Sequence, residues 1–272
     1  MGQQLDDKLK IYKHIEGALQ RHPGHKECKI IHTGKCFPPE LYFSQLLTSI
    51  LDVKADNIMF GIADDAVFSD FEEDEIKSPC PRKELDGRTI YTSRKLRMPT
   101  TNELGAPILC DFGSAVLGDK EHSEDIQPDI YRAPEVILEA PWTYSVDIWN
   151  VGCLIWNLFE GGSLFSGQDT EFQTYRSRAH LAEMIRLLGP PPPNLLARGN
   201  LTKKFFSEEG DFCAGDLVGQ PSPLEERETS LEEEDKEQFL RLVRKMLQWE
   251  PEKRSSAKEL ETDEWLQKEL HE

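Results

Sequence analysis

Residues 52–57 have the pattern D-x-K-x-x-N, and its three polar side chains could take part in phosphoryl transfer. That reaction needs a group that orients the attacking hydroxyl, a cation close to the transferred phosphate, and oxygen ligands for Mg²⁺. Asp52 could accept the proton of the hydroxyl, and Lys54 could neutralise charge on the phosphate. The amide oxygen of Asn57 could bind the metal ion, because Mg²⁺ prefers oxygen ligands.

A second stretch, Asp111-Phe112-Gly113, could complete the same site. The carboxylate of Asp111 would be a further Mg²⁺ ligand, and Phe112 would pack beneath it. Gly113 would let the backbone turn where a side chain would obstruct the phosphates. A lone D-F-G tripeptide occurs often by chance. Here it follows D-x-K-x-x-N and precedes A-P-E at 133–135 and D-x-W-x-x-G at 147–152, and this order is far more specific.

The ordered motifs resemble the C-terminal lobe of the eukaryotic protein kinases, over roughly residues 52–266. The runs Y-R-A-P-E at 131–135, D-I-W-N-V-G-C at 147–153 and L-L-G-P-P at 187–191 are similar to the group that holds cyclin-dependent, MAP, LAMMER and SR-protein kinases. SR-protein kinases resemble the chain most. The resemblance implies a mainly α fold with a few short strands, ATP and Mg²⁺ as cofactors, and serine or threonine of basic, Arg/Ser-rich proteins as phosphate acceptor.

The resemblance also assigns roles to three charged residues outside the reacting groups. Glu135 is expected to form a buried ion pair with Arg254, which would tie the activation segment to the helical lobe. Asp147 would hold the backbone of the catalytic loop. Its alternative role is that of an acid in the first turn of a helix, where the helix dipole stabilises negative charge.

Composition limits the partners. The 272 residues include 32 Lys and Arg against 50 Asp and Glu, a net charge of −18, which argues against nucleic acid or an anionic membrane and favours basic proteins. The alternative is simply a solvated acidic surface. The longest apolar run, over residues 151–159, is too short to span a bilayer. Six cysteines without a C-x-x-C pair, and no signal-like apolar start, predict the cytoplasm or the nucleus.

Residues 1–33 are expected to be a remnant of a kinase upper lobe. The sequence there holds no G-x-G-x-x-G loop and no V-A-x-K strand. Because a kinase works largely by aligning the nucleotide, we expect a truncated kinase domain with weak activity. The alternative is a catalytically inactive kinase-like binding module or the product of a splice variant.

Residues 34–51 are predicted to be an insertion. The preceding run K-I-I-H-T at 29–33 resembles the one that directly precedes the catalytic aspartate in SR-protein kinases, so joining Thr33 to Asp52 would restore an unbroken catalytic loop. The segment is expected to lie outside the packed lobe as a loop or a loosely attached helix, since Pro38 and Pro39 interrupt regular structure. The alternative is a genuine variant loop with Ile50 and Leu51 in place of His-Thr.

The lobe itself, residues 52–272, contains a charged insert over about 61–107, which is predicted to be a mobile loop at the place where SR-protein kinases carry a spacer. The activation segment that follows Gly113 has no Ser or Thr close to Tyr131, so switching by phosphorylation is not expected. SR-protein kinases dock arginines through acids whose positions here match Ala179 and Arg186, which weakens the inference of Arg/Ser-rich substrates.

Helix signals are clear in the second half. A helix buried on nearly every side is predicted over 144–160, with a stop at Gly161 and Gly162. An amphipathic helix is predicted over 180–188. Two S-x-x-E patterns, at 230–233 and at 256–259, predict capping boxes that open further helices.

Overall fold

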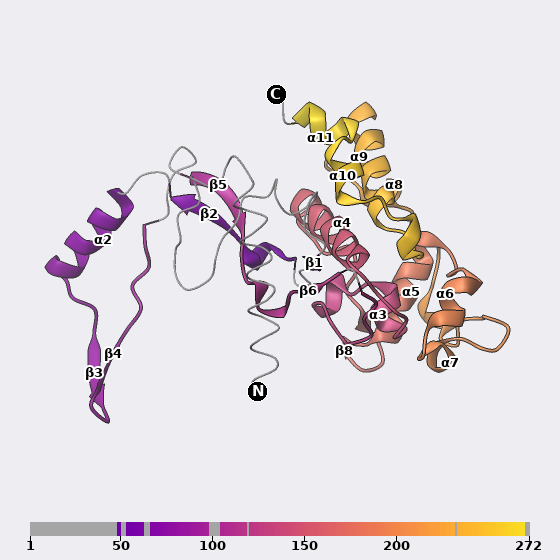
Figure 1. Ribbon diagram of the computed structural model, residues 1–272, viewed down its shortest axis with the longest axis horizontal. Coiled ribbons are helices and arrows are strands. Elements are labelled where there is room, and N and C mark those ends of the chain that lie inside the picture. The colour runs from indigo at the N-terminus through magenta and orange to yellow at the C-terminus, as the bar shows by residue number, and fades with distance from the viewer. Residues whose placement is uncertain are drawn as a thin grey trace.

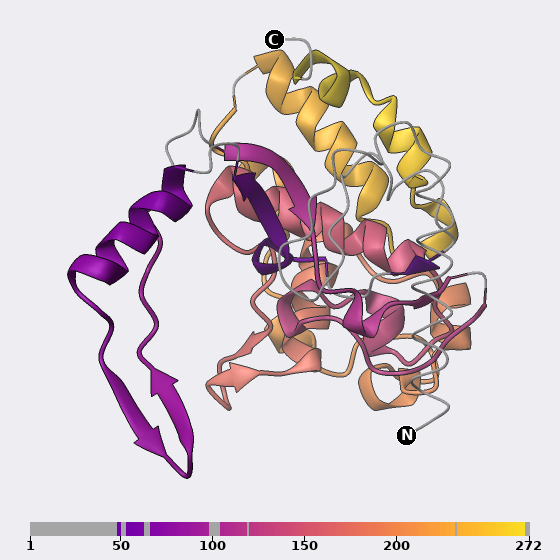
Figure 2. The same ribbon diagram turned by 60° about the vertical axis from the view of Figure 1, so that its left-hand side comes forward.

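The computed structural model describes residues 48–49, 53–62, 66–97, 104–118, 120–231 and 233–269. A helical body, formed by residues 120–231 and 233–269, makes up most of this part. Two short antiparallel sheets lie beside it, and an arm formed by residues 66–97 projects away from it (Figure 1, Figure 2). The structure is rich in helices and has only short strands, as the sequence predicted.

The helical body contains nine of the ten described α-helices: α3 (Pro134–Ile137), α4 (Ser145–Glu160), α5 (Ser177–Leu188), α6 (Pro193–Arg198), α7 (Thr202–Phe205), α8 (Leu224–Arg227), α9 (Glu233–Met246), α10 (Ala257–Glu261) and α11 (Glu264–Glu269). Single 3-10 turns occur at η6 (Asp129–Tyr131), η7 (Gly215–Leu217) and η8 (Pro251–Lys253), and β7 (Gln168–Asp169) pairs with β8 (Thr174–Tyr175).

Helix α4 is the centre of the core. Most of its residues are buried, and it ends where Gly161 adopts a left-handed conformation with φ 66°. This agrees with the predicted helix over 144–160 and its glycine stop. Helix α9 packs against α4, and its Phe239 contacts the rings of Trp156, Phe159 and Trp265 at centroid distances of 6.2, 4.9 and 5.3 Å. The apolar face of α9 therefore closes one side of the core.

Gly152 allows this close packing. A Cβ atom built at Gly152 would lie 2.9 Å from Leu247 Cδ2, closer than real Cβ atoms approach their neighbours, and 3.1 Å from Met246 Cβ, which is a tight contact. Glycine in a helix interior costs about 1 kcal/mol of helix propensity relative to alanine. The close approach of α4 to the end of α9 explains why glycine is nevertheless used here.

We expect Gly152→Ala to lower the free energy of unfolding by about 1 to 3 kcal/mol, because overpacking outweighs the gain in helix propensity. Urea denaturation would measure the loss. The matched control is Gly162→Ala, where a Cβ atom would meet nothing within 4 Å. Equal stability of the two variants would contradict this account of Gly152.

One of the two predicted capping boxes is present. Ser256 and Glu259 cap α10 reciprocally, as predicted. The box at Ser230 and Glu233 is wrong, because α9 begins at Glu233 and the Ser230 hydroxyl donates instead to the carbonyl of Phe159. The buried carboxylate of Glu228 accepts from the backbone N–H groups of Ser230 and Leu231, so it satisfies the donors in this turn.

The sheets are built from segments far apart in the sequence. Strand β2 (Ile58–Ile62) pairs antiparallel with β5 (Leu104–Leu109), and the two-residue strand β1 (Thr48–Ser49) pairs with β6 (Val116–Leu117). Strand β1 lies in the predicted insertion 34–51. The expectation that this segment stays outside the packed lobe is therefore wrong at residues 48–49, while the rest of the segment lies outside the described residues, as does the upper-lobe remnant 1–33.

The charged insert is not the structureless loop that its composition predicted. It contains helix α2 (Ala66–Lys77) and the hairpin of β3 (Arg82–Leu85) and β4 (Arg88–Tyr91). Asp86 and Gly87 form the two-residue turn of the hairpin, with φ 50° and 74°. Positive φ at both positions is typical of a type I′ turn. Among the described residues, no helix combines the length and the apolar character needed to cross a bilayer.

Candidate functional site

The β2–β5 pair brings the two motif-bearing stretches together. Strand β2 begins directly after Asn57, β5 ends directly before Cys110, and Ile58 pairs with Leu109. The backbone N–H of Cys110 donates to the carbonyl of Asn57 at 2.7 Å. Antiparallel pairing therefore places Asn57 next to Cys110 and Asp111, although about fifty residues separate them in sequence.

A single 3-10 turn, η3 (Ala55–Asn57), orients the first stretch. The N–H of Asn57 donates to the carbonyl of Lys54 at 3.0 Å, so Lys54 and Asn57 lie at the two ends of one turn. Asn57 is buried, and Lys54 is half-buried. Asp52, the predicted proton acceptor, lies outside the described residues.

Asp111 adopts a left-handed conformation, with φ 62° and ψ 66°, at the start of the 3-10 turn η5 (Phe112–Ser114). Aspartate is among the few residues that tolerate this region. Its exposed carboxylate accepts one long hydrogen bond, from the N–H of Gly113 at 3.3 Å. A Cβ atom at Gly113 would come within 3.1 Å of Asp111 Oδ1, and Phe112 is buried. The buried ring and the small glycine together hold the carboxylate toward solvent.

These donors fit Mg²⁺ that is already bound to nucleotide phosphates. Mg²⁺ takes oxygen ligands and usually binds through one or two protein groups together with phosphate and water. Asp111 offers a carboxylate with unused lone pairs, and Asn57 offers an amide on the adjoining turn. Such an ion would neutralise charge that develops on the transferred phosphate. No cluster of three or more His, Cys, Asp or Glu that could hold a metal on its own occurs in the described part of the chain.

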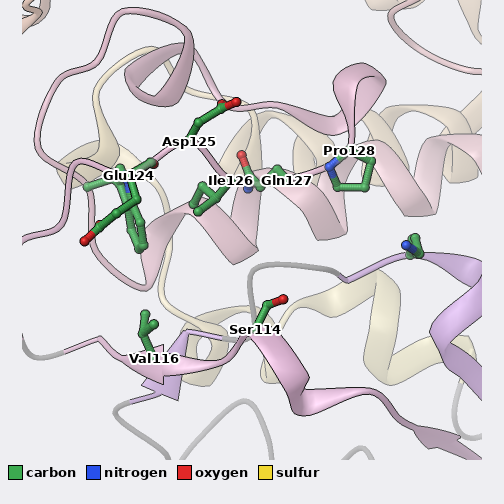
Figure 3. Close-up of a pocket in the computed structure, with 9 residues that line it drawn as sticks. Ser114, Val116, Glu124, Asp125, Ile126, Gln127 and Pro128 are labelled. Atoms are coloured by element: carbon green, nitrogen blue, oxygen red, sulfur yellow. Dashed lines mark hydrogen bonds between the residues drawn. The ribbon is translucent and has the colours of Figure 1, made fainter. Parts of the chain in front are cut away.

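A pocket of about 560 Å³ opens beside these stretches (Figure 3). Figure 3 shows Ser114 and Val116 on one side and the run from Glu124 to Pro128 on the other. Because Lys54 and Ser114 belong to the two motif-bearing stretches, the pocket is continuous with them. The lining residues are Lys54, Ser114, Val116, Glu124, Asp125, Ile126, Gln127, Pro128 and Trp142.

Gln127 fixes the far side of the pocket. Its φ of 71° is unusual for a residue other than glycine, and such strain persists only where the surroundings hold it. The side chain is clamped at both ends, since Nε2 donates to the Val146 carbonyl at 2.9 Å and Oε1 accepts from the Ala133 N–H at 2.8 Å. Sequence reasoning missed Gln127, because no local pattern signals a positive φ at glutamine.

The side chain of Arg132 binds the backbone of the segment that contains Gln127. Its guanidinium donates to the carbonyls of Ile126 and Gln127 at 3.3 and 3.4 Å and lies 3.5 and 3.3 Å from the carboxylates of Asp125 and Asp129. Carboxylates of the chain therefore already neutralise this arginine. The expectation that this segment is not switched by phosphorylation stays a prediction.

Glu135 and Arg254 form the predicted ion pair. Two parallel hydrogen bonds of 2.6 Å join Nη1 and Nη2 of Arg254 to the two carboxylate oxygens, and neither side chain is exposed. Arg254 also donates to the carbonyls of Ser145 and Gln248, each at 3.0 Å. The activation segment is thereby joined to the start of α4 and to the segment after α9.

Asp147 lies in the first turn of α4 and is 9% exposed. At this position its negative charge is stabilised by the dipole of α4. Its predicted role in holding the catalytic loop stays a prediction.

His180 is another buried titratable group close to the activation segment. It is fully buried in α5 under Phe165, and a 3.1 Å hydrogen bond joins its Nδ1 to the Tyr175 hydroxyl. Burial lowers the pKa of His180 to about 3, and the positive charge of Arg132 contributes to the same shift. The ring is therefore neutral throughout the physiological range.

We expect stability to fall on acidification from pH 6.5 to 5 because of His180. The unfolded chain protonates this histidine near pH 6.5 and the folded chain does not until about pH 3, so the unfolded state binds more protons in between. The loss is about 1.4 kcal/mol per pH unit, or roughly 2 kcal/mol over this range. Urea midpoints across the range would measure it. In His180→Phe the slope should be much smaller, and an unchanged slope would contradict the assignment.

Comparisons with known proteins identify the family of the chain. The model of the protein kinase domain matches residues 101–266. A serine/threonine protein kinase of Aspergillus fumigatus is 39% identical over 298 residues, which cover 97% of this chain and 75% of that protein. The probable serine/threonine-protein kinase sky1 of Dictyostelium discoideum is 38% identical over 167 residues, 58% of this chain and 24% of that protein.

The fold comparison agrees as well. A crystal structure of a kinase domain superposes with a TM-score of 0.55 at 25% identity, and the match covers 80% of this chain and 59% of the other. The motif order, the placement of Asn57 beside Asp111 and these relatives lead to one assignment. The chain belongs to the protein kinase family.

Proposed function

We propose that this chain transfers the γ-phosphate of MgATP to serine or threonine in basic, Arg/Ser-rich proteins. The observation that carries the proposal is the hydrogen bond from Cys110 to Asn57, which holds two potential Mg²⁺ ligands on adjoining turns. Asn57 and Asp111 would hold the metal ion with the phosphates, and Lys54 would neutralise the transferred group. Asp52 would accept the proton of the acceptor hydroxyl.

Met59 adds support for a nucleotide. It is two residues beyond Asn57 on β2, and 57% of its surface is exposed. An exposed apolar side chain next to the metal ligands is suited to contact a flat base, since nucleotide sites combine apolar walls with a few polar groups. Sequence reasoning had not singled out this residue.

The preference for basic substrates is supported by acids that line the pocket. The side chains of Glu124 and Asp125 are 70% and 76% exposed, and both belong to the wall opposite Ser114. Arginine side chains next to an acceptor serine would meet these carboxylates, of which Asp125 is shared with Arg132 at 3.5 Å. The positions where SR-protein kinases carry docking acids give no support for basic substrates, because here they hold Ala179, which is buried, and Arg186, which is basic.

A peptide assay tests the proposal. We expect phosphate incorporation into a peptide of alternating arginine and serine, and much less into one with glutamate in place of arginine. Glu124→Gln combined with Asp125→Asn should raise the KM for the arginine peptide about three- to tenfold with little change in kcat, because exposed ion pairs contribute up to about 1 kcal/mol each.

The matched control removes two acids elsewhere. Glu208 and Glu209 are exposed in the loop after α7, so Glu208→Gln with Glu209→Gln causes the same charge change away from the pocket. Equal effects of the two double variants would refute a role of the pocket. The chain holds no G-x-G-x-x-G pattern, so we propose that turnover is slow. Peptide binding without any transfer would favour a binding module instead.

A further inference from the structure

The arm combines an acidic helix with a basic hairpin. Helix α2 holds five acidic residues against one lysine, whereas residues 78–97 hold six basic residues against two acidic ones. Figure 2 shows both parts away from the helical body. Opposite charges are therefore separated along one projecting element of a chain whose net charge is −18.

Internal contacts fix the hairpin to the helix. Glu75 accepts from the N–H of Cys80 at 2.6 Å and from Arg94 Nε at 2.8 Å, and the same guanidinium donates to the carbonyl of Ser78. Arg97 lies 3.1 Å from Asp70. The start and the end of the hairpin are thereby bound to α2, so the arm keeps one shape.

The hairpin carries basic and apolar side chains on one face. Side chains of paired residues share a face of a two-stranded sheet, and Lys83 pairs with Ile90 while Leu85 pairs with Arg88. We call these four residues the tip face. Leu85 and Ile90 are 47% and 43% exposed, and a lone two-stranded hairpin is only marginally stable in water. The tip face therefore lacks the cover that such a hairpin needs.

The outer side of α2 has the complementary character. Glu72 and Glu73 precede Ile76 by four and three residues, so the three side chains lie on one face of the helix. We call them the helix face. Ile76 is 73% exposed, the most exposed of the large apolar side chains in the described residues. Both faces thus consist of exposed apolar residues flanked by charge, basic on the hairpin and net acidic on the helix, where Glu73 also pairs with Lys77 at 2.8 Å.

We propose that two copies of the chain associate through their arms, with the tip face of each copy on the helix face of the other. A two-fold symmetric interface must be self-complementary, and one arm carries both halves of such an interface. Antiparallel arms would pair Lys83 and Arg88 with Glu72 and Glu73 twice. They would also cover Leu85, Ile90 and Ile76 in both copies.

Charge reversal of each face tests the proposal by sedimentation equilibrium of the full chain. Wild type is expected to dimerise. Lys83→Glu with Arg88→Glu, and separately Glu72→Lys with Glu73→Lys, should each raise the dimer dissociation constant at least about tenfold, because like charges would face each other. An equimolar mixture of the two variants should form mixed dimers. The quadruple variant on one chain should dimerise again.

The control is Lys203→Glu with Lys258→Glu, which reverses two exposed lysines of the helical body and gives the same net charge as the tip variant. It should leave dimerisation unchanged. Far-UV circular dichroism should match wild type for all variants, since the altered side chains are exposed. A monomeric wild type, a dimer insensitive to both reversals, or failure of the mixture to associate would each overturn the proposal.

Discussion

Replacing Asp111 by alanine is expected to abolish phosphate transfer, with kcat at least 10² to 10³ times lower, roughly the cost of removing one preorganised electrostatic group from an active site. The carboxylate is exposed, held in a left-handed turn and close to Asn57, and it belongs to no cluster of three or more potential metal ligands among the described residues. Asp111→Asn keeps the shape and one oxygen but loses the charge, and should recover little activity. The fold should be unaffected, because the carboxylate makes one long hydrogen bond.

Initial rates with the arginine–serine peptide would measure this effect, and calorimetry would measure MgATP affinity in parallel. The control is Asp216→Asn, which removes an exposed carboxylate of η7. Residual activity within a few-fold of wild type in Asp111→Ala would show that the transfer does not depend on this residue. If MgATP affinity is unaltered while activity is lost, Asp111 stabilises the transition state of the transfer and does not contribute to nucleotide binding.

The site could be predicted because its motifs are short, local and ordered. The order of the motifs can be read from the sequence, and the resemblance to protein kinases supplies the expected pair of Glu135 and Arg254, which the structure shows to be buried. The left-handed conformation of Asp111 could not be predicted from the sequence. Helix α4 could also be predicted from the sequence, because its apolar periodicity and its terminal glycine indicate the same end of the helix. Each of these elements is specified by several independent signals.

The arm was misread because composition outweighed local pattern. A charged, proline-containing stretch is typical of a mobile loop. Yet Asp86-Gly87 between alternating residues is a strong hairpin signal, and Glu75 is placed to bind Cys80 and Arg94. The pairs of Glu75 with Arg94 and of Asp70 with Arg97 join the hairpin to α2, and composition alone does not reveal such contacts.

Long-range pairing explains the remaining failures. The two-residue strand β1 exists only because β6, almost seventy residues later, supplies its hydrogen-bond partners. At Ser230 a tertiary contact replaces the predicted capping box, because the Ser230 hydroxyl donates to the Phe159 carbonyl at the end of α4. Single-sequence patterns do not contain such partners.

Replacing Arg254 by alanine is expected to lower the free energy of unfolding by roughly 3 to 5 kcal/mol, because it leaves the Glu135 carboxylate buried without a partner. Five interactions of three kinds are lost together: the two 2.6 Å bonds to Glu135, the bonds to the carbonyls of Ser145 and Gln248, and the contact of the guanidinium 5.1 Å from the centre of the Trp149 ring. A protein of this size should then melt roughly 10 °C lower.

Urea denaturation and thermal melts would measure the loss, with Arg241→Ala as control. Arg241 lies 3.9 Å from Glu264 on the surface, so its removal should change the free energy of unfolding by about 0.5 kcal/mol or less. The double variant Glu135→Leu with Arg254→Met should be more stable than Arg254→Ala, since no charge is left unpaired. If Arg254→Ala is no less stable than the surface control, the pair is not what joins the activation segment to the helical body. If the double variant is no more stable than the single one, the lost bonds to Ser145 and Gln248, rather than the stranded carboxylate, account for the destabilisation.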